Sequence, residues 1–306
     1  MRDLHELPKL RDSLSYLYVE HAILNRKHNA VEYVDAEGAV LVPIASLGVL
    51  LLGPGTSVTH AAIRALAENG CTVAWVGEDA TRFYAQGLGE TRKGYRLMRQ
   101  AELVSDHEKR TRVVLRMYRK RFGHDLDPSL TLPQIRGLEG ARLRHAYAEA
   151  SRRFDVAWGG RRYDRGNWAA SDPLNRALSA ANALLNGICH VAIVSGGYSP
   201  GLGFIHTGKQ LSFVYDVADL YKTEITIPTA FATVAASSDH IDSRVRAACR
   251  EKFRQAHLLE RILPDIDEVL ELQQAPEDAV DVDVDGACPE ELWSPLVSED
   301  ESLWSS

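Results

Sequence analysis

A histidine, two aspartates and a lysine lie close together in the sequence and are the side chains best suited to chemistry. They occur in the stretch GFIHTGKQLSFVYDVADLYK, residues 203–222, as His206, Asp216, Asp219 and Lys222. If residues 209–221 are helical, the last three lie along one edge, because a helix turns once every 3.6 residues. An imidazole nitrogen and carboxylate oxygens suit Mn²⁺ or Mg²⁺. A solvated acidic face beside a histidine fits the same spacing.

Glu139 is a further acidic candidate, in the segment LPQIRGLEGARLR. The flanking Gly137 and Gly140 each cost about 1 kcal/mol relative to Ala inside a helix. Two such costs around one carboxylate indicate close approach of the backbone to another helix or to DNA. The plainer alternative is a surface glutamate paired with Arg136 or Arg142.

The segment GGRRYDRGNW, residues 159–168, is rich in arginine and aromatic side chains. Arg161 and Arg162 are suited to contact phosphates, and Tyr163 and Trp168 could stack on unpaired bases at the end of a duplex. An ordinary polar loop with two anchoring aromatic residues would have the same composition.

The composition indicates a globular protein with a substantial core. The chain has 306 residues, of which 45% are apolar, and this size favours two domains. Its four cysteines are widely spaced and form no CxxC pair, which favours reduced thiols over a disulfide framework or a zinc site. No signal peptide and no uninterrupted apolar run of membrane-spanning length is evident. We therefore expect a cytoplasmic protein with no membrane partner.

The net charge of −7 hides a strong asymmetry along the chain. All 35 Lys and Arg residues precede Ile262, whereas 14 of the 42 Asp and Glu residues lie from Ile262 onward. The body therefore carries a balance of +7 and the tail −14. A basic body favours a polyanionic partner, because a separate acidic tail does not cancel a local positive surface.

The periodicity predicts an α+β protein. Residues 14–88 are β-rich, with turn chemistry at 35–38 that favours a hairpin. The predicted strands are 14–19, 29–34, 39–44, 49–52, 73–76 and 82–86, and a helix is predicted at 56–69. The later part is helical, with predicted helices at 97–122, 133–154, 174–195 and 241–263, the last broken at Pro264.

This pattern predicts three regions. They are a small N-terminal β-rich domain at 1–90, a larger all-α catalytic domain at 91–272 and an acidic, mostly disordered tail at 273–306.

Four motifs together resemble one family. Gln134–Arg144, Arg161–Asp164, Gly203–Lys209 and Leu211–Asp219 occur in the order found in the CRISPR-associated adaptation integrases (Cas-one), the spacer-acquisition endonucleases. The resemblance runs from about Leu7 to Leu270 and is strongest to the type I-E (Cascade) subtype.

The resemblance implies an N-terminal β domain that dimerises and a helical domain that holds a divalent metal. Glu139, His206 and Asp219 match the three metal ligands of that family, which use Mg²⁺ or Mn²⁺. Asp216 matches an acidic residue needed beside them, and Lys222 matches a basic residue that contacts the reacting DNA.

The resemblance also implies contacts with DNA. Arg82 matches a DNA-contacting arginine of the β domain, and Tyr163 and Trp168 match the pocket that handles the splayed end of the captured duplex. The chain departs from the family at Ser57, where an arginine is expected, so the resemblance does not carry one phosphate contact over to this position.

The function implied is insertion of short foreign DNA duplexes (spacers) into a CRISPR repeat array by attack of a 3′-hydroxyl on a phosphodiester. A smaller partner protein, itself a dimer, would bridge two dimers of this chain. Two alternatives remain open from the residues alone: a metal nuclease acting on branched DNA repair intermediates, and a non-catalytic DNA-binding scaffold.

Overall fold

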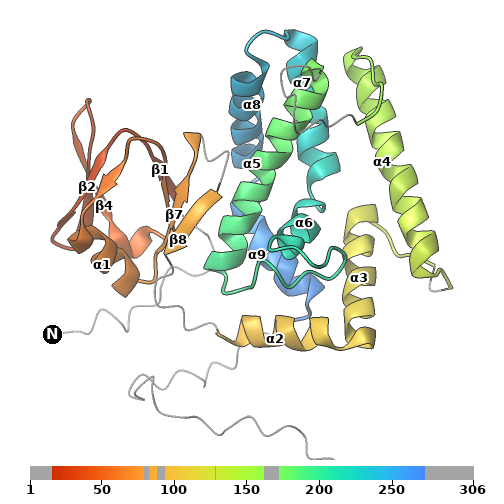
Figure 1. Cartoon of the computed structure of the whole chain (residues 1–306), viewed down its shortest axis with the longest axis horizontal. Helices are drawn as coiled ribbons and strands as arrows, with labels where there is room; N and C mark the ends of the chain where they lie inside the picture. Colours follow the sequence, from red (N-terminus) through yellow and green to blue (C-terminus); the bar gives the residue numbers. More distant parts are fainter. Residues whose placement is uncertain (1–15, 79–82, 88–93, 128, 162–171, 273–306) are drawn as a thin grey trace, which may run out of the picture. The chain divides into compact units, whose positions relative to one another are not determined.

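Two small β-sheets come first along the chain, and helices follow them (Figure 1). The computed structural model describes residues 16–78, 83–87, 94–127, 129–161 and 172–272. The expected α+β class, with a β-rich N-terminal region and a larger helical region, is confirmed. The predicted tail at 273–306 lies outside the described residues, and the boundary near residue 90 stays a prediction.

The first sheet has the strand order β1-β5-β7-β8. Strands β1 (Tyr16–Val19), β5 (Val49–Leu52) and β7 (Thr72–Val76) run parallel, and β8 (Phe83–Gly87) pairs antiparallel with β7. Every residue of β5 is buried. The short apolar run at 49–52 therefore forms the buried central strand that its composition predicts.

The second sheet has the order β4-β3-β2-β6. It contains β2 (Ile23–Lys27), β3 (Ala30–Val34), β4 (Ala39–Pro43) and β6 (Ser57–Val58), and a short 3₁₀ turn (Ile44–Ser46) follows β4. The predicted β3–β4 hairpin is confirmed, and Asp35 accepts hydrogen bonds from two backbone amides of its turn. Strand β2 was not predicted, because its second half is polar and breaks the apolar alternation.

Helix α1 (His60–Glu68) is shorter than the predicted 56–69. Thr59 caps it, with its hydroxyl accepting from the amide of Ala62, and residues 57–58 pair with β2 instead. Gly70 follows the helix with a φ of 66°, as a C-terminal stop requires.

The predicted single helix at 97–122 is wrong. The structure has two helices, α2 (Gly94–Ser105) and α3 (His107–Phe122), which meet at a corner at Asp106 (Figure 1). Asp106 is extended and its carboxylate accepts the amide of Lys109 at 2.8 Å, so it starts a new helix.

Helices α4 (Leu132–Phe154) and α5 (Pro173–Ser195) confirm the predictions for these regions. A capping box of Thr131 and Gln134 starts α4, and Asp172 caps α5. Among the described residues, α5 is the helix whose length and apolar composition would suffice to cross a membrane, but 67% of that apolar window is buried within the protein. Such burial is typical of the central helix of a core.

The helix predicted at 209–221 is short and irregular. Helix α6 (Ser212–Ala218) is followed by a π-helical turn, η4 (Lys222–Thr226), and then α7 (Ile227–Ala236). Asp219 is the C-cap of α6 and Lys222 begins the π turn. The predicted edge of Asp216, Asp219 and Lys222 is therefore not one continuous α-helix, because Lys222 belongs to the π turn.

The last two helices are α8 (Ile241–Gln255) and α9 (Leu258–Val269). The predicted break at Pro264 is wrong, because Pro264 lies inside α9 and the chain turns at His257, whose φ is 47°. Proline leaves the carbonyl of Glu260 without its usual helical donor, and Glu260 is exposed, so water can satisfy it.

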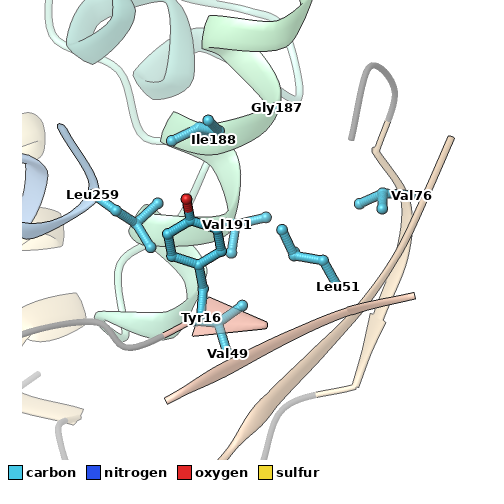
Figure 2. Close-up of a pocket in the computed structure, with 8 residues that line it drawn as sticks. All are labelled: Tyr16, Val49, Leu51, Val76, Gly187, Ile188, Val191 and Leu259. Carbon is cyan, nitrogen blue, oxygen red and sulfur yellow. The ribbon is translucent and has the colours of Figure 1, made fainter. Parts of the chain in front are cut away.

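The first sheet, β1-β5-β7-β8, packs against α5. Val49, Leu51 and Val76 lie opposite Ile188 and Val191, around a small cavity of about 10 Å³ (Figure 2). Beside it the Phe83 and His190 rings lie 3.9 Å apart, and burial lowers the pKa of His190 to about 4. His190 is therefore uncharged at neutral pH.

Asp172→Ala tests the cap that starts α5. The carboxylate accepts the backbone amide of Asn175 at 2.9 Å and its side-chain amide at 2.8 Å. We expect a loss of about 1 kcal/mol in the free energy of unfolding at pH 7, measured by urea denaturation. Asp172→Asn, which keeps a capping oxygen, should retain most of this stability, and equal losses in the two variants would contradict the cap.

The same substitution has a predicted pH dependence. Burial alone would raise the pKa of Asp172, but the hydrogen bonds from Asn175 hold it below its usual value. The stabilisation by Asp172 is therefore present above the unfolded-state pKa and is lost as the pH falls through the folded-state pKa. The difference between wild type and Asp172→Ala should shrink between pH 5 and pH 3.

Candidate active site

The carboxylate of Asp216 organises the loop that carries the candidate histidine. Asp216 is fully buried, and its Oδ2 accepts the amides of Phe204 at 2.6 Å and Ile205 at 3.0 Å. Its Oδ1 accepts the amide of His206 at 2.9 Å. Three successive amides thus wrap one carboxylate, an arrangement that stabilises the charged form of a buried acid.

The same carboxylate orients the imidazole of His206. Nδ1 of His206 lies 2.7 Å from Oδ1 of Asp216, and the side chain is 44% exposed. A carboxylate oxygen accepts in such a contact, so Nδ1 is the donor and Nε2 is the ring nitrogen that can bind another group. An imidazole held by a carboxylate in this way is prepared to bind a metal or a proton through Nε2.

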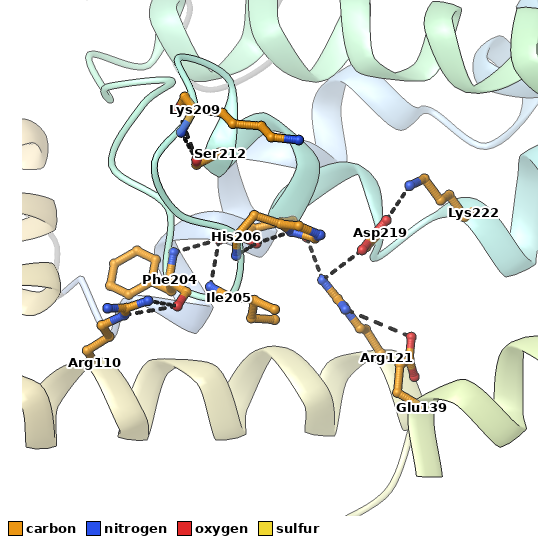
Figure 3. A network of polar contacts seen from close by, with 11 residues as sticks. Arg110, Arg121, Glu139, Phe204, Ile205, His206, Lys209, Ser212, Asp219 and Lys222 are labelled. Atoms are coloured by element: carbon orange, nitrogen blue, oxygen red, sulfur yellow. Dashed lines mark hydrogen bonds and ion pairs between the residues drawn. The ribbon is translucent and has the colours of Figure 1, made fainter. Parts of the chain in front are cut away.

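Two helices hold the loop from its other side. Gln100 of α2 is fully buried; its Nε2 donates to the carbonyls of Ser199 and Leu202, both at 3.0 Å, and its Oε1 accepts the amide of Ser199 at 2.8 Å. Arg110 of α3 donates through Nε and Nη2 to the carbonyl of Phe204 at 3.0 and 2.7 Å (Figure 3). The corner between α2 and α3 is what allows both side chains to reach the loop.

Gly203 lets the loop pass close to the start of α6. A Cβ at this position would lie 2.3 Å from the carbonyl oxygen of His206 and 2.7 Å from Cβ of Ser212. Such contacts are too short for any other residue unless the backbone moves. Gly203 therefore fixes a close approach between the loop and the start of α6.

A buried arginine joins the two other candidate ligands. Arg121 of α3, whose side chain is 2% exposed, places Nη1 3.9 Å from Oε1 of Glu139 and Nη2 3.4 Å from Oδ2 of Asp219 (Figure 3). Nη2 also donates to the carbonyl of Asp216 at 3.1 Å, and the guanidinium lies over the ring of Tyr118. The network therefore links Glu139, Asp219 and the loop that carries His206.

Each of these two carboxylates has a second cationic partner. Arg142 donates to Glu139 through Nε at 2.8 Å and Nη2 at 3.1 Å, and Lys222 forms an ion pair with Asp219. Burial alone would raise the pKa of Asp219, but Lys222 and Arg121 hold it below its usual value. Asp219 is therefore ionised at neutral pH.

The donor set suits a hard divalent cation, because it consists of two carboxylates and an imidazole with an available Nε2. The cationic guanidinium of Arg121 already lies between Glu139 and Asp219. Among the residues that the structure describes, no three His, Cys, Asp or Glu side chains close on one point as a metal group. The assignment of Glu139, His206 and Asp219 as ligands of one ion stays a prediction.

The comparison with protein families decides the identity of the fold. The family model described as CRISPR associated protein Cas1 matches residues 15–124 and 124–247. The chain belongs to the Cas1 family. The resemblance inferred from the motifs at 134–144 and 203–219 is confirmed at the level of the family.

Relatives with known names cover most of the chain. A CRISPR-associated endonuclease Cas1 of Thermus thermophilus is 56% identical over 292 residues, which is 95% of this chain and 90% of the relative. The CRISPR-associated endonuclease Cas1 of Escherichia coli is 38% identical over 282 residues, 90% of this chain and 92% of the relative. The chain is thus similar to Cas1 endonucleases along nearly its whole length.

Solved structures share this architecture. The crystal structure of a TtCas1-DNA complex has a TM-score of 0.78 and 57% identity, covering 86% of this chain and 99% of that one. A casposase bound to its integration product has a TM-score of 0.54 at 13% identity, covering 85% of this chain and 96% of that one. The second comparison shows the fold alone.

Glu139 agrees only in part with each of the two interpretations of its sequence, a close backbone approach and a surface ion pair. It pairs with Arg142, as the plainer alternative supposes, but it is only 8% exposed and so does not lie on an open surface. A Cβ at Gly137 would meet nothing within 4 Å in the described part of the chain, and at Gly140 it would meet only Arg144 at 3.4 Å. The close helix approach expected at these glycines is therefore not found within the described residues.

The predicted DNA-contacting residues are only partly described. Arg161 donates to the backbone and side-chain oxygens of Asn175 and to the hydroxyl of Ser179, so its guanidinium is bound to the start of α5. Ser57 is exposed in β6. The others lie outside the described residues and stay predictions: Arg82, Arg162, Tyr163 and Trp168.

Two residues that hold this Cas1 site, Gln100 and Arg121, were not recognised as special from the sequence. In the sequence Arg121 is one of many basic residues within 97–122, and Gln100 has no distinguishing context. A signal for Arg121 was available: it stands four residues after Met117 and three after Tyr118, both on the buried face of α3. An arginine on an apolar helix face requires a buried acidic partner.

Gln100→Leu tests the cross-link between α2 and the loop. It removes three hydrogen bonds and leaves backbone groups of Ser199 and Leu202 without partners, so we expect a loss of about 2 kcal/mol in unfolding free energy, measured in urea. Thr233→Val is the matched control, because its buried hydroxyl donates only within its own helix, to Thr229 at 2.7 Å. A loss for Gln100→Leu no larger than that of the control would contradict the cross-link.

Proposed function

We propose that this chain is a metal-dependent DNA integrase and endonuclease that inserts short foreign DNA duplexes into a CRISPR repeat array. The observation that carries the proposal is the single polar network joining His206, Glu139 and Asp219 in a member of the Cas1 family. The relatives named CRISPR-associated endonuclease support a reaction on DNA.

The proposed reaction is a transesterification of phosphodiesters. A 3′-hydroxyl of the captured duplex attacks a phosphorus of the repeat, the new P–O bond forms, and the 3′-oxygen of the cut strand leaves and takes up a proton. The number of phosphodiester bonds does not change, so the step needs no energy source.

The residues of this chain would share the work as follows. Glu139, Asp219 and His206 through Nε2 would hold Mg²⁺ or Mn²⁺, which polarises the target phosphodiester and stabilises charge on its oxygens when bound. Asp216 fixes the imidazole in one tautomer and one orientation. Lys222, next to Asp219, would neutralise negative charge that develops on the reacting phosphate.

The proposed substrate is a short duplex with splayed ends together with the repeat DNA. The balance of +7 over residues 1–261 favours a polyanion, and one similar structure is titled a Cas1–DNA complex. Arg82, Arg161 and Arg162 are proposed to contact phosphates, and Tyr163 and Trp168 the splayed end.

The remaining parts of the proposal follow the family resemblance. They are membership of the type I-E subtype, a cytoplasmic location, a homodimer formed through the β-rich region at 1–90, and a smaller dimeric partner that bridges two such dimers.

His206→Ala tests the proposed function. With the presumed partner, a supercoiled repeat plasmid, a labelled short duplex and Mg²⁺ or Mn²⁺, we expect strand joining to fall about 100-fold or more, because one proposed ligand is lost. Binding of the duplex, measured by fluorescence anisotropy, should change less than about twofold, since the many Lys and Arg residues of the chain would supply most of the attraction to phosphates.

His145→Ala is the matched control, because His145 is an exposed histidine of α4 that lies near Glu149 and outside the polar network of His206, Glu139 and Asp219 in the described part of the chain. It should leave both measurements unchanged. Equal loss of binding and joining in His206→Ala would refute a dedicated catalytic role, and cut strands without joined product would favour a nuclease over an integrase.

A further inference from the structure

The guanidinium of Arg121 is buried but poorly satisfied. Its side chain is 2% exposed, and its Nε has no hydrogen-bond partner among the described residues. It forms one hydrogen bond, to the carbonyl of Asp216 at 3.1 Å, and otherwise lies over the ring of Tyr118. A charged group removed from water normally requires several good hydrogen bonds, so this cation is weakly held for its burial.

Its contacts with the two carboxylates are ion pairs rather than hydrogen bonds. The distances of 3.9 Å to Glu139 and 3.4 Å to Asp219 exceed the 2.7–3.2 Å of a normal N–H···O bond. Arg142, by contrast, donates to Glu139 at 2.8 and 3.1 Å. The electrostatic attraction therefore holds Arg121 between the acids without saturating their oxygen lone pairs.

Arg121 also differs from its cationic neighbours in what it touches. In the described part of the chain, Arg142 pairs with Glu139 and Lys222 pairs with Asp219, whereas Arg121 reaches both acids at once. A divalent ion bound by both carboxylates would need the same place between them. Two cations cannot occupy that place, because their repulsion at such a distance is large in a buried site.

We infer that Arg121 is a resident counter-ion that a divalent metal must displace from Glu139 and Asp219. It keeps the two carboxylates near each other while no metal is bound, and it lowers their affinity for the metal by competing for the same oxygens. The inference rests on the proposed function only in taking Glu139, His206 and Asp219 as the metal ligands.

The test is titration of Mn²⁺ alone, without DNA, into the full-length protein by isothermal calorimetry. Arg121→Gln should bind Mn²⁺ about tenfold more tightly than wild type, which is the scale on which one close charge changes the binding of a proton to a carboxylate. Arg116→Gln is the matched control, since it removes the same charge from α3 where the side chain contacts Val269 and Glu271. It should change the affinity less than about twofold.

Thermal melting supplies a second readout. Without metal, Arg121→Gln should melt at a lower temperature than wild type, because two partly buried acids lose a shared cation. The gap should narrow as Mn²⁺ is added, since the tighter-binding variant gains more stability from the ion. Unchanged or weaker Mn²⁺ binding by Arg121→Gln, or a gap that does not narrow, would overturn the inference.

A third measurement covers the case in which Arg121→Gln does not fold. In a crystal structure of wild type with Mn²⁺, the guanidinium should have left both carboxylates, and an Arg121 still within ion-pair distance of both would overturn the inference. His206→Ala separates the two proposals. If it binds Mn²⁺ as wild type does, the proposed metal ligands are wrong and the inference falls with them; if it loses binding while Arg121→Gln matches wild type, only the inference fails.

Discussion

The buried carboxylate of Asp216 is the contact on which the rest of the site depends. It accepts three backbone amides and faces the ring nitrogen of His206, so both of its oxygens have hydrogen-bond partners inside the protein. Hydrogen bonds to a charged group contribute about 1.5–3 kcal/mol each. Opening the loop at 204–206 would leave this carboxylate buried without its donors, and the position of the imidazole is therefore fixed by the folding of the core itself.

The site also contains cationic side chains that pair with its acids. Arg121, Arg142 and Lys222 surround Glu139 and Asp219, so the acids are paired before any ligand arrives. Buried carboxylates without such partners would take up protons or destabilise the fold. The arrangement reconciles two demands, because the helical region can fold stably while Glu139 and Asp219 stay paired and close together.

The sequence was most informative where local chemistry determines structure. The helix starts predicted at 133 and 174 agree with those of α4 and α5, and the apolar run at 49–52 forms the buried strand that its composition predicts. Asp106 and Pro264 were misjudged, because each is compatible with two local conformations and tertiary contacts select one.

The site shows the same limit of sequence reasoning. Asp216 and Asp219 are identical in type and three residues apart. Asp216 nevertheless accepts hydrogen bonds from backbone amides, whereas Asp219 forms ion pairs with Arg121 and Lys222. Their different roles depend on what the loop at 204–206 and helix α3 bring to them, and no local pattern encodes that.

The corner at Asp106 has a mechanical consequence. Helix α3 contacts the carbonyl of Phe204 through Arg110, and it contacts Glu139 and Asp219 through Arg121. A rotation of this helix about its axis would therefore shift the imidazole of His206 and both acids together.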